Sequence, residues 1–93
     1  MKRIGNSAFQ NTESLLSIFI PASVEVIGEL AFYRSALETI EFEEGSKLME
    51  IGDRAFENSA LHSIVLPASL EKIGNEIFFG CSIEPMPKRI KKL

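Results

Sequence analysis

Few residues of this 93-residue chain have the types and spacing that catalytic chemistry requires. The sequence contains one histidine, His62, and one cysteine, Cys81, and a Cys–His dyad would need both side chains at one site. No HExxH, GxSxG or CxxC pattern is present, and a single cysteine cannot close an internal disulfide. We therefore predict that the chain is not an enzyme and has no catalytic residues.

The densest group of ionisable residues is the stretch ETIEFEEGS, which contains Glu38, Glu41, Glu43 and Glu44. If this stretch is a strand, Glu41 and Glu43 point to the same side of it. Two carboxylates are too few for a calcium ion, which takes six to eight oxygen ligands. The pattern favours a solvated acidic patch, and we predict no metal and no cofactor.

The distribution of charge argues against a nucleic-acid partner. The sequence has 10 Lys and Arg against 13 Asp and Glu, a net charge of −3. Six basic residues lie at the two ends, so the stretch from Ile4 to Pro87 holds four against all 13 acids, a net charge of −9 (4 − 13). A region with this net negative charge lacks the basic surface that phosphate binding requires.

The basic segment KRIKK (88–92) has two interpretations. It could touch an acidic lipid surface or nucleic acid, or it could form a helical cap in which Ile90 and Leu93 cover the end of the fold. We favour the cap.

No apolar run approaches the ~20 residues of a membrane span. The N-terminal MKRIGNSAF also lacks the apolar stretch of a signal peptide. The compartment stays open: cytoplasmic, or cell-surface or secreted if the chain is part of a longer protein.

The strongest pattern in the sequence is an internal repeat. The pair Ile-Gly recurs at Ile4, Ile27, Ile51 and Ile73, with spacings of 23, 24 and 22 residues. A period of this length is typical of leucine-rich-repeat solenoids. Other positions recur in step with it: an aromatic column (Phe9, Phe32, Phe56, Phe78), a small-residue column (Thr12, Ser35, Ser59, Cys81) and an apolar column (Leu15, Leu37, Leu61, Ile83). In a solenoid, each column packs against the same column of the next coil.

The repeat also predicts local structure. The segments SIFI (17–20), TIEF (39–42) and SIVL (63–66) have apolar residues at every second position, which predicts strands with one buried face. GELAFYR and GDRAFEN each offer about one helical turn, and segments that end in Ile-Gly, such as ASVEVIG, are predicted to be extended. The recurring glycine either takes a positive φ at a bend or permits two coils to approach closely.

These residues resemble the BspA-type leucine-rich-repeat family, whose repeat reads LxxIxIPxSVxxIGxxAFxxCxxL. The resemblance is carried by LLSIFIPASVEVIGELAFYRSAL (15–37) and LHSIVLPASLEKIGNEIFFGCSI (61–83), and it extends over about residues 4–84. Ser35 and Ser59 depart from it, because the family usually has cysteine at these positions. The resemblance implies a right-handed solenoid, a fragment of an α/β-type horseshoe, with a short concave parallel sheet and short helical turns on the convex side. It also implies adhesion or protein binding, with no catalytic residues and no cofactor.

We predict a single domain over residues 1–93 with about 3.5–4 coils. The predicted coils span about residues 4–26, 27–50, 51–72 and 73–87, followed by a basic tail at 88–93.

Function is expected where the strands face out of the concave sheet. The outward residues are predicted to be Ser17, Phe19, Thr39, Glu41, Glu43, Ser63 and Val65. Phe19 is the most informative, because a large apolar side chain on an exposed face is a candidate anchor for a partner. Alternatively, Phe19 shields a terminal strand or packs against a symmetry-related copy.

The predicted function is a non-catalytic protein-binding or adhesion module with an unknown protein partner. The alternative is a structural repeat scaffold, a fragment of a larger surface protein, that forms homo-oligomers through uncapped solenoid ends.

Overall fold

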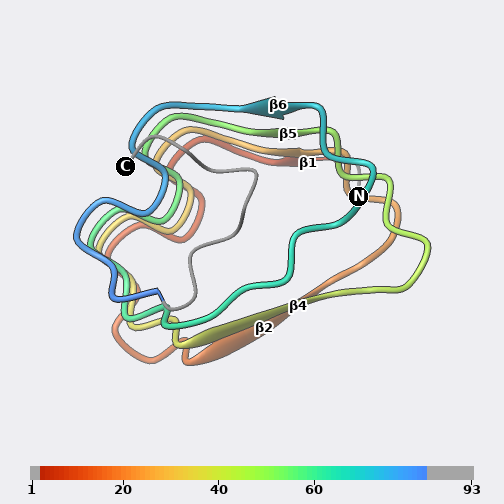
Figure 1. Ribbon diagram of the computed structural model, residues 1–93. Coiled ribbons are helices and arrows are strands. Elements are labelled where there is room, and N and C mark those ends of the chain that lie inside the picture. The colour runs from red at the N-terminus through yellow and green to blue at the C-terminus, as the bar shows by residue number, and fades with distance from the viewer. Residues whose placement is uncertain (1–2, 84–93) are drawn as a thin grey trace.

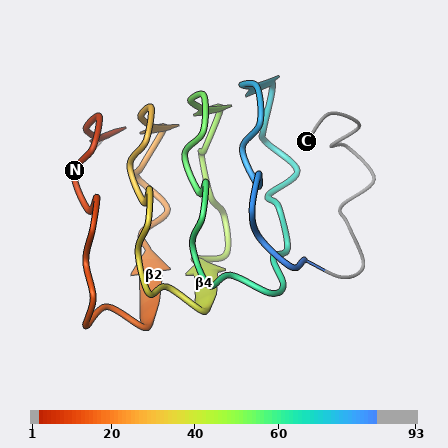
Figure 2. The ribbon, with the colours of Figure 1, turned by 90° about the vertical axis from the view of Figure 1, so that its left-hand side faces the viewer.

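The Ile-Gly repeat forms a ladder of very short parallel strands along one side of the molecule. The computed structural model describes residues 3–83, which wind through successive coils stacked along one axis (Figures 1 and 2). The ladder has the order β1-β3-β5-β6. Its strands are β1 (Arg3–Ile4), β3 (Val26–Ile27), β5 (Glu50–Ile51) and β6 (Lys72–Ile73). The register aligns the four isoleucines of the repeat. The segments that end in Ile-Gly, which were predicted only to be extended, therefore form the sheet with the larger number of strands.

A second, two-stranded sheet lies on the opposite side of the coils (Figure 1). It pairs β2 (Ser17–Ile20) with β4 (Thr39–Phe42) in parallel, and the register places Phe19 beside Glu41. The prediction of strands at 17–20 and 39–42 is confirmed. The prediction of a third strand at 63–66 is wrong: this segment is not a strand and is not paired with β4.

The pairing stops at β4 because coils of different length meet there. Five residues (43–47) separate Phe42 from Leu48, whereas three (67–69) separate Leu66 from Leu70. Between the first two coils a similar mismatch is bridged, because the Glu43 carboxylate accepts a hydrogen bond from the Ala22 N–H at 2.7 Å. Pro67 stands at the position of Glu43 in the next coil and has no carboxylate to repeat this bond. In Figure 1 the segment 63–66 accordingly runs inside the line of β2 and β4.

The convex-side helical turns that the sequence suggests are not present in residues 3–83, which contain no helix. Tight turns replace them, and two positions of each turn take a positive φ. The first column is Ser7, Leu30, Arg54 and Glu76, and the second is Asn11, Arg34, Asn58 and Gly80. Bonds between residues three apart close these turns, such as that from the Ser35 N–H to the Phe32 carbonyl at 3.2 Å. Because the sign of φ changes along the turn, no run of helical bonds can form.

The turns use their remaining N–H groups to bind the next coil. Every second residue donates across the coil interface: Ser7, Phe9 and Asn11 to the carbonyls of Glu29, Ala31 and Tyr33. The same three bonds recur at the next two interfaces, with N···O distances of 2.7 to 3.1 Å over all nine. A helix would close these groups within one coil, so the ladder of bonds between coils is the physical reason for the turns.

The aromatic column forms a continuous stack through the core. The centroids of Phe9 and Phe32, Phe32 and Phe56, and Phe56 and Phe78 are 5.1, 5.2 and 5.8 Å apart, with interplanar angles of 7°, 6° and 17°. Phe32, Phe56 and Phe78 are buried, while Phe9 at the first coil is partly exposed. The predicted aromatic column is therefore confirmed as the centre of the core.

The recurring glycine permits close approach of the coils, and this observation decides between the two predicted roles. A Cβ atom at Gly52 would lie 2.6 Å from the backbone nitrogen of Glu29 in the preceding coil. A Cβ at Gly28 or Gly74 would collide with Asn6 or Asp53 in the same way, whereas a Cβ at Gly5 would meet nothing. None of these four glycines has a positive φ.

Truncation of the aromatic stack should destabilise the fold strongly. We expect Phe56→Ala to lower the free energy of unfolding by about 3–5 kcal/mol, because it removes a buried ring between two others. Urea denaturation followed by circular dichroism measures this loss. Phe79→Ala is the matched control, since Phe79 is 50% exposed and should cost little. A Phe56→Ala variant as stable as the control contradicts the stack.

The glycine column gives a second test with an internal control. We expect Gly52→Ala to cost about 1–3 kcal/mol, because the added methyl group overpacks the contact with Glu29. Gly5→Ala should change the stability of the monomer by less than about 0.5 kcal/mol, since the site is open. Thermal denaturation of both variants compares them, and equal losses would exclude close approach as the reason for the column.

Candidate functional site

The seven predicted binding residues all lie exposed on one surface of the structure. We call this surface the strand face; it is the outward side of β2, β4 and residues 63–66. The exposed residues on it are Ser17, Phe19, Thr39, Glu41, Glu43, Ser63 and Val65. The strand register brings Ser17 beside Thr39 and Phe19 beside Glu41. Ser63 and Val65 belong to the unpaired segment, so they do not extend these two strand rows by hydrogen bonding.

Two large apolar side chains stand out on the strand face. Phe19 is 53% exposed and Val65 is 85% exposed. They lie on the first and third coils, with Glu41 on the coil between them. Apolar groups flanking a carboxylate can bury area against a protein and also select for a basic group on it.

Glu43 also has a structural role on this face. Its carboxylate accepts the Ala22 N–H at 2.7 Å and so fastens the second coil to the first. Glu38, Glu41 and Glu44 have no ion pair with any residue of 3–83. The predicted solvated acidic patch thus consists of three carboxylates without an ion pair and one that is hydrogen-bonded to the backbone.

A surface hollow of about 450 Å³ lies between the second and third coils at the strand face. It is bounded by residues 40–46 on one side and 65–69 on the other. The hollow lies where the third strand was expected, and its lining includes Glu41, Glu43 and Val65. No signal in the single sequence indicated it, because SIVL has the same alternation as SIFI.

Sequence reasoning missed Leu16, which is 53% exposed just before β2. Leu16 occupies the position that is Glu38 in the next coil and His62 in the third, since each follows a buried or half-buried leucine. The signal was available: Leu16 is an apolar residue in a row whose other members are polar.

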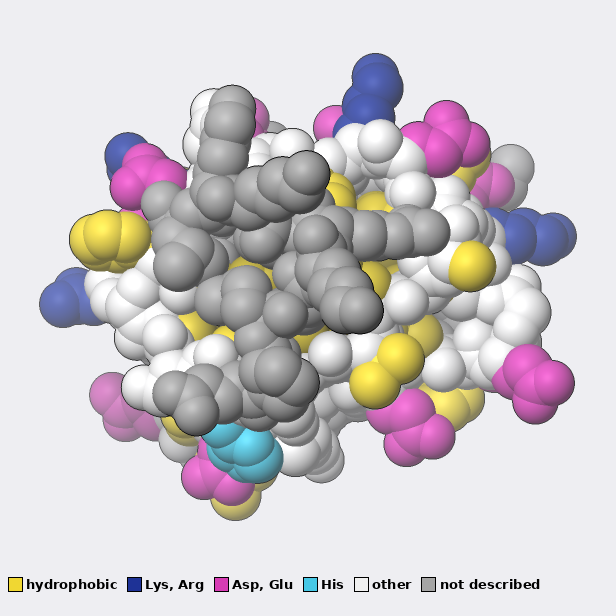
Figure 3. All heavy atoms as spheres, viewed as in Figure 1, with side chains coloured by type: hydrophobic (Ala, Val, Ile, Leu, Met, Phe, Trp, Pro, Cys, Tyr) yellow, Lys and Arg dark blue, Asp and Glu magenta, His cyan; other side chains and the backbone are white. Residues whose placement is uncertain are grey.

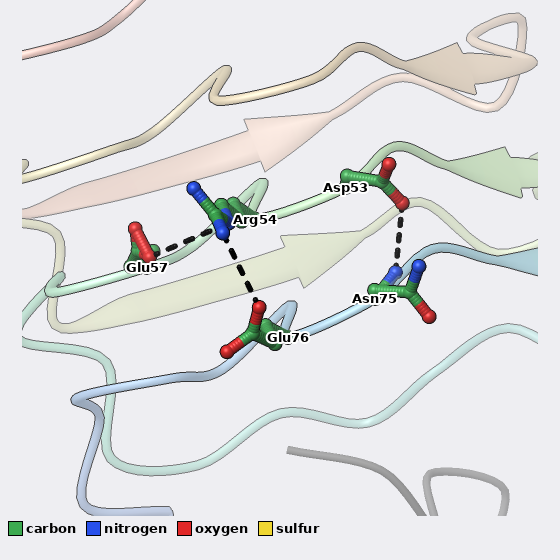
Figure 4. Close-up of polar contacts among 5 residues, drawn as sticks. All are labelled: Asp53, Arg54, Glu57, Asn75 and Glu76. Atoms are coloured by element: carbon green, nitrogen blue, oxygen red, sulfur yellow. Dashed lines mark hydrogen bonds and ion pairs between the residues drawn. The ribbon is translucent and has the colours of Figure 1, made fainter.

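The polar contacts on the turn side are structural. Arg54 lies 3.9 Å from the Glu57 carboxylate and 3.4 Å from that of Glu76, which links two coils (Figure 4). Asp53 accepts the Asn75 N–H at 2.8 Å in the same region (Figure 4). The Arg54–Glu76 pair is exposed, and such pairs contribute little to stability, whereas Glu57 is a buried residue. Within residues 3–83, no three His, Cys, Asp or Glu side chains lie close enough to hold a metal ion.

Cys81 and His62 do not form a catalytic pair in this structure. The Cys81 thiol donates to the Phe56 carbonyl at 2.9 Å and lies 3.3 Å from the Ser59 hydroxyl. It is therefore a member of the small-residue column, in which Thr12 donates to the Phe9 carbonyl at 2.8 Å. His62 is exposed. Figure 3 shows acidic side chains spread around the rim of the molecule in this view.

Two further sequence predictions concern the chain ends and the membrane. The predicted cap at 88–92, with Ile90 and Leu93, lies outside the described residues. Residues 3–83 contain no helix with the length and apolar character to cross a bilayer.

Comparison with known proteins decides the family. The family model described as "BspA type Leucine rich repeat region (6 copies)" matches residues 1–88. The chain belongs to the BspA-type leucine-rich-repeat family. The predicted resemblance is therefore confirmed, and so is the leucine-rich-repeat solenoid with parallel sheets. No curated protein matches the chain in sequence.

Solved structures of two other proteins resemble this BspA-type chain. The pneumococcal vaccine antigen PcpA has 34% identity and a TM-score of 0.79 over 91% of this chain and 24% of its own. A leucine-rich repeat protein from Bacteroides capillosus has 33% identity and a TM-score of 0.69 over 90% of this chain and 64% of its own. The chain thus spans about a quarter of the first protein and less than two thirds of the second.

Proposed function

We propose that this BspA-type chain is a non-catalytic protein-binding module that acts in adhesion at a cell surface and uses the strand face, the predicted concave side, for recognition. The proposal rests on the exposure of Phe19, which lies beside Glu41 in the strand register, and of Val65 on the coil that follows Glu41. Isolated surface apolar residues are common, but here Phe19 is exposed on β2 and Val65 is exposed at the hollow of the same strand face, so both offer a partner apolar area to bury. The vaccine antigen among the similar structures supports a surface location.

The backbone under this face suits recognition because it is rigid. Both strands are held by the parallel ladder between β2 and β4, and the buried Ile20 side chain anchors the end of β2. A backbone that is already held in place loses little further conformational entropy when a partner binds.

Substitution on the strand face should weaken partner binding without unfolding the chain. We expect Phe19→Ala and Glu41→Lys each to reduce affinity about tenfold or more, because one removes an apolar anchor and the other reverses a charge. The melting temperature should shift by less than about 4 °C. Surface plasmon resonance against a panel of purified secreted and cell-surface proteins measures the first quantity, and calorimetry the second.

Phe79→Ala is the matched control for this experiment. Phe79 is 50% exposed, close to the value for Phe19, but it lies on the turn side of the fourth coil. The control should bind as the unmodified chain does. If Phe19→Ala and Phe79→Ala weaken binding equally, the strand face is not the recognition surface.

A second candidate function, self-association, is favoured by the exposed side of the first coil. A hollow of about 510 Å³ lies there, lined by Phe9, Thr12, Glu13, Ser14 and Leu15. The carbonyls of Asn6, Ala8 and Gln10 correspond to those that accept the turn bonds in later coils, yet they accept none within residues 3–83. Gly5 leaves room for another coil in the same register. A second copy of this chain could stack on this side as a scaffold of repeats.

The two functions are separated by analytical ultracentrifugation. If copies stack in register, sedimentation should show association at micromolar concentration, and Gly5→Ala should weaken it at least tenfold. The reason is that a Cβ at the corresponding glycines collides with the preceding coil. Monomeric behaviour at high micromolar concentration, or association that Gly5→Ala leaves unchanged, would contradict this second function.

A further inference from the structure

The strand β4 has two edges, and only one of them is paired. The N–H groups of Thr39 and Glu43 donate to the carbonyls of Leu16 and Ile20, on the side of β2. Successive residues of a strand direct their backbone groups to opposite edges, so those of Ile40 and Phe42 point toward the third coil. Within residues 3–83 neither residue has a backbone hydrogen bond on that side.

The segment opposite this free edge is also unpaired. The backbone groups of residues 63–66 make no hydrogen bond to any other described residue. Beyond this segment the two coils are bonded, since Ser69 donates to the Leu48 carbonyl at 2.7 Å and Glu71 to that of Met49 at 2.9 Å. The hollow of about 450 Å³ lies along this gap, so the edge of β4 is reachable from outside.

The lining of the hollow has one sign of charge. Glu41, Glu43 and Glu44 contribute carboxylates, and no Lys, Arg or His is among the lining residues. Ile40, Phe42 and Leu66 add apolar surface on the inner side. A strand beside β4 would therefore meet carboxylates on its outward face and apolar groups on its inward face.

We infer that this gap is a binding site for an extended peptide segment in which basic and apolar residues alternate. The peptide adds as a strand to the free edge of β4, and its backbone pairs with Ile40 and Phe42. Its basic side chains lie beside Glu41 and Glu43, and its apolar side chains cover Leu66. This inference rests on the proposed protein-binding function and names the kind of partner that the strand face takes.

Hydrogen exchange of the free chain is the first test. The amides of Ile40 and Phe42 should exchange at least tenfold faster than those of Thr39, Glu41 and Glu43, which face β2. Equal protection of both sets in the unbound chain would mean that the edge is already paired, and that result overturns the inference.

Titration with designed peptides is the second test. The probe is an eight-residue peptide of alternating lysine and valine with blocked ends, and the control is the same peptide with glutamate for lysine. The lysine peptide should bind at least tenfold more tightly, weaken with added salt, and protect the Ile40 and Phe42 amides. Equal binding of both peptides overturns the inference.

Backbone methylation distinguishes strand addition from simple charge attraction. N-methyl groups on the valine amides block one edge of the peptide strand, and N-methyl groups on the lysine amides block the other. One of the two isomers should lose binding at least tenfold while the other keeps it. If both isomers bind alike, the contact is electrostatic only and the strand pairing is refuted.

Variants test the site against a matched control. Glu41→Gln combined with Glu44→Gln should weaken the lysine peptide at least fivefold, whereas Phe79→Ala, on the turn side of the fourth coil, should leave it unchanged. Loss of peptide binding in Phe79→Ala places the peptide elsewhere. If the peptides fail to bind while Phe19-dependent capture of a protein persists, the inference fails and the proposed function stands.

Discussion

The contact between one coil and the next is the interaction on which every described element depends. At each interface three turn N–H groups, one Phe ring and a two-residue strand meet their counterparts about 22 to 24 residues away in sequence. None of these units is stable alone, since a two-residue strand has no bonds of its own and a turn has only the few bonds between residues three apart. The core, the sheets and the turns are therefore consequences of stacking.

Stacking also explains why the surface is free to carry function. The buried columns are fixed by the need to match the neighbouring coil, as shown by the parallel rings of Phe32 and Phe56. The outward positions on the strands have no such requirement, so Phe19 and Glu41 can sit side by side without a structural reason. Function in this chain is thus expected from residues that break the repeat rather than from those that make it.

The sequence predicts the features that recur in every coil. It does not predict those that depend on bonds between coils or on one difference in coil length. The aromatic column, the glycine column and the strands at 17–20 and 39–42 follow from periodicity and were predicted. The turns were not, because residues such as Leu30 and Arg34 rarely take a positive φ and short apolar turns look helical in isolation. Their conformation is imposed by bonds to the next coil, which no local pattern reveals.

The gap beside β4 was equally hidden from the sequence. The SIVL segment has the alternation of a strand, and its failure to pair arises from the longer turn at 43–47 and from Pro67 in place of Glu43. All seven candidate binding residues were predicted to be exposed from alternation alone. The hollow between the coils requires the three-dimensional offset of one segment, which alternation does not encode.

The positive φ angles of 53° to 60° in the turns have a consequence for how the chain loses its structure. Each non-glycine residue in this conformation carries a cost of about 1–2 kcal/mol, which the bonds to an adjacent coil offset. When a neighbouring coil unfolds, a coil keeps the strain of its positive-φ residues and loses the hydrogen bonds that offset it, so it should unfold next. Unfolding is then expected to proceed from the end coils toward the middle ones, whose amide hydrogens should exchange last.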